Sequence, residues 1–333
     1  MSIASIKKIE YVLGEKKITN NDLKTIYSNG YDFEKFEKKV GIKSRFISEK
    51  FTTLDLAYHA AEKLFESSNI DKKNIDFLIL CTQSPEYLIP TNSCILQNRL
   101  GLNEDIGTYD YNLGCSGYVY GLSMAKGLVE TNQAKNILLI TSETYSRYLN
   151  EKDFINRLIF SDAASATLIV NKGKNQIKNF SFKTKGSDFD KLIVKNNFFT
   201  KKLKPEFKKN GDYSKYTDND LFMDGKSIFE FTIKEVPKFI SRMLEENNLE
   251  VNDVNFYILH QPNKFLLESI RKRTKIPKEK FIIDIEKYGN IVSNTIPIVL
   301  KNKFNFFEKF KGRILLCGFG VGLSMAGCII ENK

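Results

Sequence analysis

The chain has 333 residues, with 51 Lys and Arg against 40 Asp and Glu, and a formal net charge of +11. Hydrophobic content of 42% and charged content of 27% are ordinary for a folded protein and exclude global disorder. No run of about 18 apolar residues occurs, so no membrane span is expected, and the N-terminus becomes polar too early for a secretory signal. Five scattered cysteines, an odd number, favour a reduced, cytoplasmic setting over a disulfide framework.

The excess of positive charge has two explanations. A basic surface suits acidic partners such as nucleic acids, anionic membranes, acidic carrier proteins or phosphorylated cofactors. The abundance of Lys, Asn, Ile and Phe can equally be a bias of composition. Zinc-finger spacing, RNA-binding aromatic motifs and long Lys/Arg blocks are missing from the sequence, so we expect no nucleic-acid partner.

The first half alternates predicted helices and strands. A stripe of Leu54, Ala57, Ala61 and Leu64 predicts an amphipathic helix at 53–67. Short apolar runs such as FLILC predict buried strands. The elements expected up to the middle of the chain are strands at 77–81, 106–111, 136–142, 166–170 and 177–183, and a helix at 117–130.

The second half repeats this alternation. Its predicted helices lie at 228–247, 264–273 and 293–303, the last with Pro297 in its first turn, where proline is tolerated. Its predicted strands lie at 256–259, 313–318 and 324–330. Alternation in both halves predicts an α/β fold, and the similar order suggests a duplicated unit, residues 1–172 followed by residues 173–333.

A polar, Lys-rich segment interrupts the second half at residues 185–220. We expect a surface excursion there rather than core. Two interpretations stay open, a solvated insertion and a functional lid.

Cys115 lies in a turn that could hold a catalytic nucleophile. The stretch YNLGCSG at 111–117 places it after a predicted strand, in a glycine-flanked turn, at the head of a predicted helix. This is the geometry of a nucleophile elbow with Cys in place of Ser. The flanking glycines allow unusual backbone angles, and the positive end of the helix favours the thiolate. A small buried cysteine that only packs in a tight turn is the competing interpretation.

The chain has only two histidines. His59 falls within a helical pattern and is predicted to be structural. His260 follows the apolar run FYIL and precedes Gln-Pro-Asn, so it lies at the carboxyl end of a strand, where open α/β sheets place their sites. Duplication of the halves would bring His260 and Cys115 together near a pseudo-twofold axis. Asn290, which follows Tyr288-Gly289, offers an amide before another helix.

These motifs together resemble the β-ketoacyl-(acyl-carrier-protein) synthase III family of the thiolase superfamily. Their order and spacing agree along essentially the whole chain. The matching stretches are NLGCSGYVYG at 112–121, MDG at 223–225, HQPN at 260–263, YGN at 288–290 and GFGVGLS at 318–324.

The resemblance implies a thiolase-like, five-layered αβαβα fold of two similar halves, acting as a homodimer. It implies a catalytic triad of Cys115, His260 and Asn290. The cysteine would take an acyl group from a thioester. A malonyl-type thioester would then lose carbon dioxide and attack the acyl-cysteine, while His260 and Asn290 stabilise the enolate. The substrates would be acyl thioesters of coenzyme A or acyl carrier protein.

The resemblance also implies an oxyanion hole made by the backbone N–H groups of Cys115 and, by alignment, Val321. Losing one such donor typically costs about 3–4 kcal/mol. No metal or redox cofactor is implied. No cluster of carboxylates and histidines in the sequence suggests a metal site.

Three positions depart from the family pattern or vary within it. The chain has no Trp at the position where many relatives use one to bind coenzyme A, although Lys39 matches the Arg that accompanies it. This departure disfavours a coenzyme A primer and favours an acyl donor bound to carrier protein. Gln83 stands where hydroxymethylglutaryl-CoA synthases carry a catalytic Glu, which disfavours that branch. Ile89 occupies the position that reaches across the dimer to shape the partner's acyl pocket.

Four basic residues follow His260, namely Lys264, Arg271, Lys272 and Arg273. Such a patch suits an acidic carrier protein and its phosphopantetheine arm. Basic residues at a helix end also complement the helix dipole, and both interpretations stay open.

Two functions compete with decarboxylative condensation. One is an acyltransferase of the same fold that moves an acyl group to a hydroxyl or amine without decarboxylation; Asn290 argues against it. The other is a non-catalytic binding protein that uses the basic surface.

Overall fold

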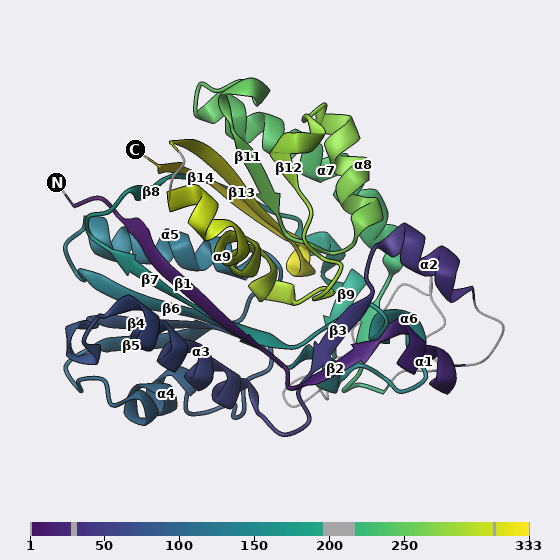
Figure 1. Cartoon of the computed structure of the whole chain (residues 1–333), viewed down its shortest axis with the longest axis horizontal. Helices are drawn as coiled ribbons and strands as arrows, with labels where there is room; N and C mark the ends of the chain where they lie inside the picture. The colour runs from purple at the N-terminus through teal and green to yellow at the C-terminus, as the bar shows by residue number, and fades with distance from the viewer. Residues whose placement is uncertain (1, 28–31, 196–216, 309–310, 333) are drawn as a thin grey trace.

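A computed structural model describes residues 2–27, 32–195, 217–308 and 311–332 (Figure 1). The α-helices are α1 (Asn20–Ile26), α2 (Phe33–Val40), α3 (Thr53–Ser68), α4 (Asn92–Leu100), α5 (Gly117–Glu130), α6 (Phe154–Arg157), α7 (Gly225–Glu246), α8 (Lys264–Thr274) and α9 (Thr295–Glu308). The strands are β1 (Ser5–Leu13), β2 (Lys16–Thr19), β3 (Ser44–Ile47), β4 (Phe77–Cys81), β5 (Gly107–Tyr111), β6 (Asn136–Glu143), β7 (Ala163–Val170), β8 (Asn175–Thr184), β9 (Leu192–Val194), β10 (Leu221–Met223), β11 (Phe256–Leu259), β12 (Phe281–Ile282), β13 (Gly312–Gly320) and β14 (Ser324–Asn332).

The predicted helices and strands are confirmed, mostly with shifted ends. The strands β4 and β11 and the helix α5 begin and end at the predicted residues. The predicted start of α9, residue 293, is two residues too early, because a 3-10 turn at Val292–Asn294 precedes the helix. Pro297 does lie in its first turn, where its missing N–H leaves no helical bond unmade.

The large sheet shows the duplication directly. Its strand order is β12-β11-β13-β14-β8-β1-β7-β6-β4-β5. Read outward from the centre, each half has its first strand, then its last strand antiparallel to it, and then three strands with the same pattern of parallel and antiparallel pairing. The two halves join where Ser5 pairs with Gln176. The expectation of two similar halves is confirmed at the level of topology.

The helices complete five layers (Figure 1). The helix α3 packs on β1, β6 and β7 of the first half, while α7 packs on β13 and β14 of the second. Between the halves lie α5, which contacts strands of both, and α9. Tyr118, Val119 and Leu122 of α5 are fully buried in the shared core. This central layer positions the site, because α5 and α9 both begin beside it.

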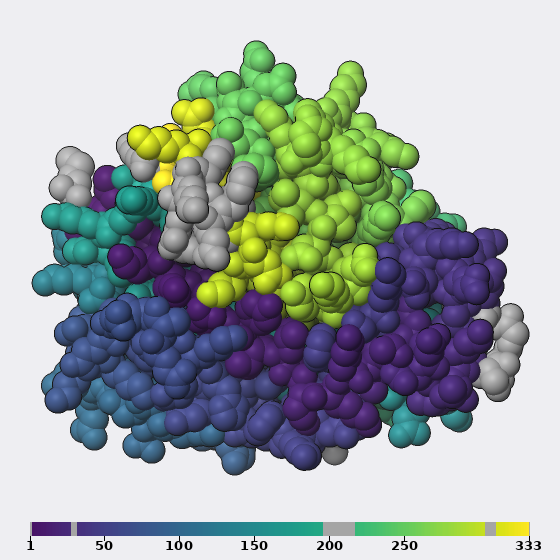
Figure 2. All heavy atoms as spheres, viewed as in Figure 1, coloured from purple at the N-terminus to yellow at the C-terminus, as the bar shows by residue number. Residues whose placement is uncertain are grey.

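Several elements were not predicted, notably β1, α2 and α4. The strand β1 carries Lys7 and Lys8 and has an irregular register between Ile6 and Lys8, which breaks the alternation expected of a strand. The helix α2 packs against α8, as Figure 2 also shows, where the purple surface of α2 adjoins the light green of α8.

The expected surface excursion at residues 185–220 is partly wrong. Residues 196–216 lie outside the described part of the chain. The described flanks form a 3-10 helix (Gly186–Lys191) and the two strands β9 and β10, which pair antiparallel. Leu192 and Leu221 in these strands are buried. Their apolar runs LIV and LFM belong to the core because they pack beside Cys115.

Candidate active site

Cys115 sits where β5 ends and α5 begins, as predicted for an elbow. Its side chain is buried. The neighbouring strand β13 passes very close: a Cβ atom on Gly318 would lie 2.8 Å from the Cys115 carbonyl oxygen, and one on Gly320 would lie 2.9 Å from Cys115 Sγ. Gly114 and Gly117, which flank the cysteine, are needed because a larger side chain would not fit there. They are not needed for an unusual backbone angle, since neither has a positive φ. That part of the elbow prediction is corrected.

The resting thiol of Cys115 is protonated. Burial raises its pKa to about 12, and the nearby Glu143 carboxyl adds to the rise. Backbone hydrogen bonds from Val321 and from Cys115 itself lower the pKa, because both N–H groups favour a negative sulfur. The expected lowering of the pKa by the helix end is therefore outweighed by desolvation. These are the same two N–H groups that were predicted to form the oxyanion hole, and both point at the sulfur.

His260 follows β11 and is buried. Its backbone N–H donates to the Cys317 carbonyl at 2.9 Å, which fixes it to the end of β13. Its Nδ1 lies 2.8 Å from Thr295 Oγ1, and its ring meets the Phe319 ring edge to face at 5.5 Å. Burial lowers the pKa of His260 to about 3, so the imidazole is neutral at physiological pH.

Asn290 lies between β12 and α9, the connection that corresponds in the second half to the one carrying Cys115. Its backbone N–H donates to the Ile159 carbonyl at 2.8 Å. Its side-chain Oδ1 accepts a hydrogen bond from the Val292 N–H at 2.9 Å. This leaves the amide nitrogen of the side chain, a donor, as the group that Asn290 offers to a substrate.

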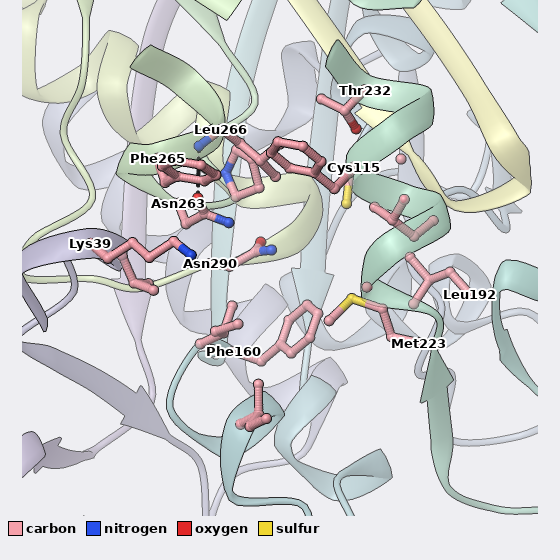
Figure 3. A pocket seen from close by; sticks show the side chains of 18 of the residues that line it. Lys39, Cys115, Phe160, Leu192, Met223, Thr232, Asn263, Phe265, Leu266 and Asn290 are labelled. Atoms are coloured by element: carbon pink, nitrogen blue, oxygen red, sulfur yellow. Dashed lines mark hydrogen bonds between the residues drawn. The ribbon is translucent and has the colours of Figure 1, made fainter. Parts of the chain in front are cut away.

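A cavity of about 660 Å³ brings the three residues together. Cys115, His260 and Asn290 all line it, as Figure 3 shows for the labelled Cys115 and Asn290. Most of the remaining lining is apolar and includes Phe160, Leu192 and Met223 (Figure 3). The cavity therefore offers one nucleophile and two hydrogen-bond donors on a largely apolar wall.

Lys39 stands at the rim of this cavity, from the end of α2. Its Nζ lies 4.7 Å from the centre of the Phe265 ring. The ring of Phe265, which is 42% exposed, stacks on Phe229 with centres 5.5 Å apart. The sequence reasoning missed this aromatic pair, although Phe265 directly follows the predicted basic residue Lys264.

The other predicted basic residues lie outside the cavity. Lys264 lines an adjoining groove beside Gly41. Arg271 is engaged in the fold, with an ion pair to Glu268 at 2.8 Å and a bond to the Ile276 carbonyl. Lys272 and Arg273 are exposed in the last turn of α8. Among the described residues, no hydrogen bond or ion pair is found for the side chains of Lys272 and Arg273, so both can meet a partner.

Ile89 is 86% exposed and lines neither the cavity nor the groove. Tyr87 and Leu88, which precede it, are 57% and 65% exposed. The other histidine, His59, is on the exposed side of α3, with its ring against Phe51 and Tyr58, in agreement with a structural role.

Glu143 is a buried residue of the site region that the sequence reasoning missed. Its carboxyl oxygens accept hydrogen bonds from the Gln83 N–H at 3.0 Å, Ser84 Oγ at 3.3 Å and Ser293 Oγ at 3.1 Å. Burial raises its pKa to about 8. These bonds tie the end of β4 to the loop that follows Asn290. The one available signal was an acidic residue at the end of the apolar strand NILLITSE.

The described residues contain no group of three or more His, Cys, Asp and Glu side chains arranged to hold a metal ion. Among the helices described, none combines the length and the apolar character that crossing a lipid bilayer requires.

A duplicated α/β fold with a cysteine, a histidine and an asparagine on one cavity is the arrangement of thiolase-like condensing enzymes. Comparison with known proteins agrees with this class. Residues 109–186 match the family model of 3-oxoacyl-[acyl-carrier-protein (ACP)] synthase III, and residues 244–332 match the model of its C terminal part. The chain belongs to this family, which lies in the thiolase superfamily and consists of acyltransferases.

Individual relatives cover nearly the whole chain. A β-ketoacyl-[acyl-carrier-protein] synthase III of Fusobacterium nucleatum is 34% identical, with 99% of each chain covered. One of Clostridium perfringens is 33% identical over 88% of this chain and 89% of its own. A crystal structure of a 3-oxoacyl-(acyl-carrier-protein) synthase III superimposes with a TM-score of 0.91 at 41% identity, covering 99% of both chains. The predicted family and fold are confirmed.

Proposed function

We propose that this protein catalyses the decarboxylative condensation of an acyl thioester with a malonyl-type thioester on acyl carrier protein. The observation that carries the proposal is the single cavity on which Cys115, His260 and Asn290 meet. Family membership supports the same reaction. The product is a β-ketoacyl thioester, and the reaction serves fatty acid synthesis or a related acyl-chain pathway.

The first half-reaction loads Cys115. Its sulfur attacks the thioester carbonyl, the tetrahedral oxyanion accepts hydrogen bonds from the N–H groups of Cys115 and Val321, and the pantetheine sulfur leaves. The thiol proton ends on that leaving sulfur. The result is an acyl-cysteine on the largely apolar wall of the cavity.

The second half-reaction forms the carbon–carbon bond. The malonyl group loses carbon dioxide, and the electrons of the broken bond pass into an enolate. The Asn290 amide and the His260 ring each offer an N–H to the enolate oxygen. The carbanion then attacks the acyl carbonyl and expels the Cys115 thiolate. An enolate needs two such donors, whereas simple acyl transfer to a hydroxyl or amine does not, so the alternative acyltransferase is not favoured.

The proposal includes a homodimer. Within the described residues, β5 is an edge strand that pairs only with β4, and unpaired edges invite pairing with another chain. The exposed apolar run of Tyr87, Leu88 and Ile89 precedes α4, which packs beside β5. A second copy of this chain would cover both features. The predicted role of Ile89 at the partner's acyl pocket depends on this arrangement.

The proposal also includes the cytoplasm as the place of action. All five cysteines are free thiols, and four of them are buried in the fold. A reducing compartment keeps such thiols free. We propose no cofactor beyond the coenzyme A or phosphopantetheine that carries each substrate.

The decisive experiment separates loading from condensation. The protein is incubated with acyl-coenzyme A and acyl-carrier-protein thioesters and weighed intact, and carbon dioxide release is followed from labelled malonyl-carrier protein. We expect an acyl group on Cys115 and carbon dioxide release with the condensed product. Cys115→Ala removes the loading, whereas Cys94→Ala, at an exposed thiol on α4, retains it. Loading without carbon dioxide release would favour the acyltransferase instead.

A further inference from the structure

The Val321 N–H, which points at the Cys115 sulfur, belongs to a short loop between β13 and β14. Gly320 pairs with Ser324 across the base of this loop. Val321 stands between Gly320 and Gly322, and Gly322 has a φ of +123°. Glycines on both sides leave the peptide planes around Val321 weakly restrained. A further contact is therefore needed to keep its N–H directed at the sulfur.

Ser324 supplies that contact. Its side chain is buried, and its hydroxyl donates to the Val321 carbonyl oxygen at 2.9 Å. Its Oγ also lies 2.7 Å from the Oγ of Ser116, which is buried as well. A serine hydroxyl has one proton to donate and two lone pairs that accept. Because Ser324 gives its proton to Val321, Ser116 is the donor in the bond between the two serines.

Ser116 makes a bond that its position does not predict. It follows Cys115 and is the N-cap residue of α5, where a serine oxygen ordinarily accepts a hydrogen bond from an N–H of the first turn. Within the described chain its side chain makes no such cap bond and contacts Ser324 instead. The hydroxyl thus connects the nucleophile turn to β14 rather than stabilising the start of its own helix.

Two hydrogen bonds therefore join the two donors of the predicted oxyanion hole. They run from Ser116, the residue after Cys115, through Ser324 to the carbonyl of Val321. A tetrahedral oxyanion is stabilised best by donors that are already fixed at the right spacing before the reaction begins.

We propose that Ser324 and Ser116 are positioning residues, which hold the Val321 N–H at the spacing from the Cys115 N–H that the acyl oxyanion needs. The inference rests on the proposed function, because it assumes that Cys115 attacks a thioester. It goes beyond that function in assigning the geometry of the oxyanion hole to two side chains that do not touch the substrate.

The test compares two reactions of Cys115. Acetyl-pantetheine acylates the sulfur through a tetrahedral oxyanion, whereas iodoacetamide alkylates it by displacement of iodide, with no oxyanion. Both reactions start from the thiolate, so a changed thiol pKa alters both rates alike. The ratio of the acylation rate to the alkylation rate therefore isolates the oxyanion hole. Intact mass spectrometry follows both reactions in a Cys94→Ala background, which removes the exposed thiol.

Ser324→Ala removes the bond to Val321 and should lower this ratio by at least about tenfold, part of the roughly hundred- to thousandfold that a whole donor is worth. Ser116→Ala should lower the ratio by about threefold, because Ser324 still donates to Val321 but is itself less firmly held. The double variant should match Ser324→Ala, since Ser116 acts only through Ser324.

Ser5→Ala is the matched control. The Ser5 side chain is buried, and its hydroxyl also donates to a backbone carbonyl, that of Gly173 at 3.2 Å, but at the start of β1. Its removal should leave the ratio unchanged.

The outcomes distinguish the inference from the function on which it rests. Failure of wild-type protein to take an acetyl group on Cys115 would overturn the proposed function. Loading by wild-type protein together with a wild-type ratio in Ser324→Ala would overturn the positioning role alone, even if both rates fell together. Losses that simply add in the double variant would contradict the route through Ser324. Should Ser324→Ala not fold, as judged by circular dichroism, the ratios of Ser116→Ala and Ser5→Ala still decide, and equal ratios would overturn the inference.

Discussion

The backbone N–H of Val292 donates a 2.9 Å hydrogen bond to the side-chain oxygen of Asn290. The carbonyl of the same residue accepts from Thr295 Oγ1 at 3.2 Å, and that hydroxyl lies 2.8 Å from His260 Nδ1. Val292 has a φ of +49°, unusual for a β-branched residue. One residue in a left-handed conformation thus helps to orient both donors of the proposed condensation.

The Thr295 hydroxyl has a single proton, which goes either to the Val292 carbonyl or to His260 Nδ1. When it goes to Nδ1, the ring proton of the neutral His260 is on Nε2, where it can stabilise an enolate. Thr295→Val removes this donation, so we expect carbon dioxide release to fall by about tenfold, one hydrogen bond's worth, with Cys115 loading nearly retained. Thr295→Ser should restore the rate. Equal loss of both half-reactions in Thr295→Val would show a merely structural role.

Gly320 leaves room for the sulfur of Cys115. A methyl group there would lie 2.8 Å from Cys115 Cβ and 2.9 Å from Sγ. Gly320→Ala should therefore displace the nucleophile and slow loading by about a hundredfold, the typical cost of a displacement near 1 Å. Gly127→Ala in α5 meets open space and serves as the control. Normal loading by Gly320→Ala, measured by mass spectrometry, would contradict the geometry.

The neutral state of His260 predicts how stability depends on pH. Burial lowers its pKa from 6.5 to about 3, so between these values the unfolded chain binds a proton that the folded protein does not. The free energy of unfolding should fall as pH drops below 6.5, by about 2 kcal/mol from this site between pH 7 and pH 5. His260→Gln lacks this loss. Thermal unfolding of both proteins should show their difference changing with pH; parallel curves would refute the prediction.

Lys272 and Arg273 test the docking of a carrier protein. Reversing both to Glu should slow reaction with carrier-bound malonyl by about tenfold, a modest steering effect, and leave reaction with malonyl-pantetheine nearly unchanged. The wild-type advantage should shrink with added salt. Lys172 and Lys174, exposed in the turn between β7 and β8, give the control reversal. If both pairs act alike, the positive charge is a matter of composition.

Ile89 tests the homodimer. An aspartate in place of this exposed isoleucine would place a charge in an apolar interface, so Ile89→Asp should weaken dimerisation by about 2 kcal/mol or more. Light scattering after gel filtration measures the shift. Ile26→Asp, at another exposed isoleucine, should have no effect. A wild-type monomer would remove the dimer from the proposal.

Elements whose pattern lies in their own residues were predicted from the sequence, and elements that depend on distant partners were not. The strand FLILC and the helix from Gly117 depend on their own residues, so β4 and α5 were predicted with correct ends. The strand β1 was missed because Lys7 and Lys8 obscure its pattern, and only pairing with β7 and β8 makes it a strand. Cys115 was placed at the right turn for the wrong electrostatic reason, since burial outweighs the helix end.

Residues of the site that act through distant partners could not be predicted. The place of Tyr145 beside Cys115 arises only when Gln83, Phe160 and Leu192, far apart in sequence, come together. Thr295 matters because its Oγ1 lies 2.8 Å from His260 Nδ1, and no spacing in the sequence reveals this contact.

The duplicated topology has a consequence for the order in which the molecule matures. Cys115 belongs to the connection between β5 and α5, and Asn290 to the equivalent connection between β12 and α9, while His260 follows β11. The nucleophile is thus synthesised in one half, and both donors arrive with the other. A nascent chain that has completed only its first half carries the thiol without the groups that would make it useful. Catalytic competence under the proposed function therefore requires both halves.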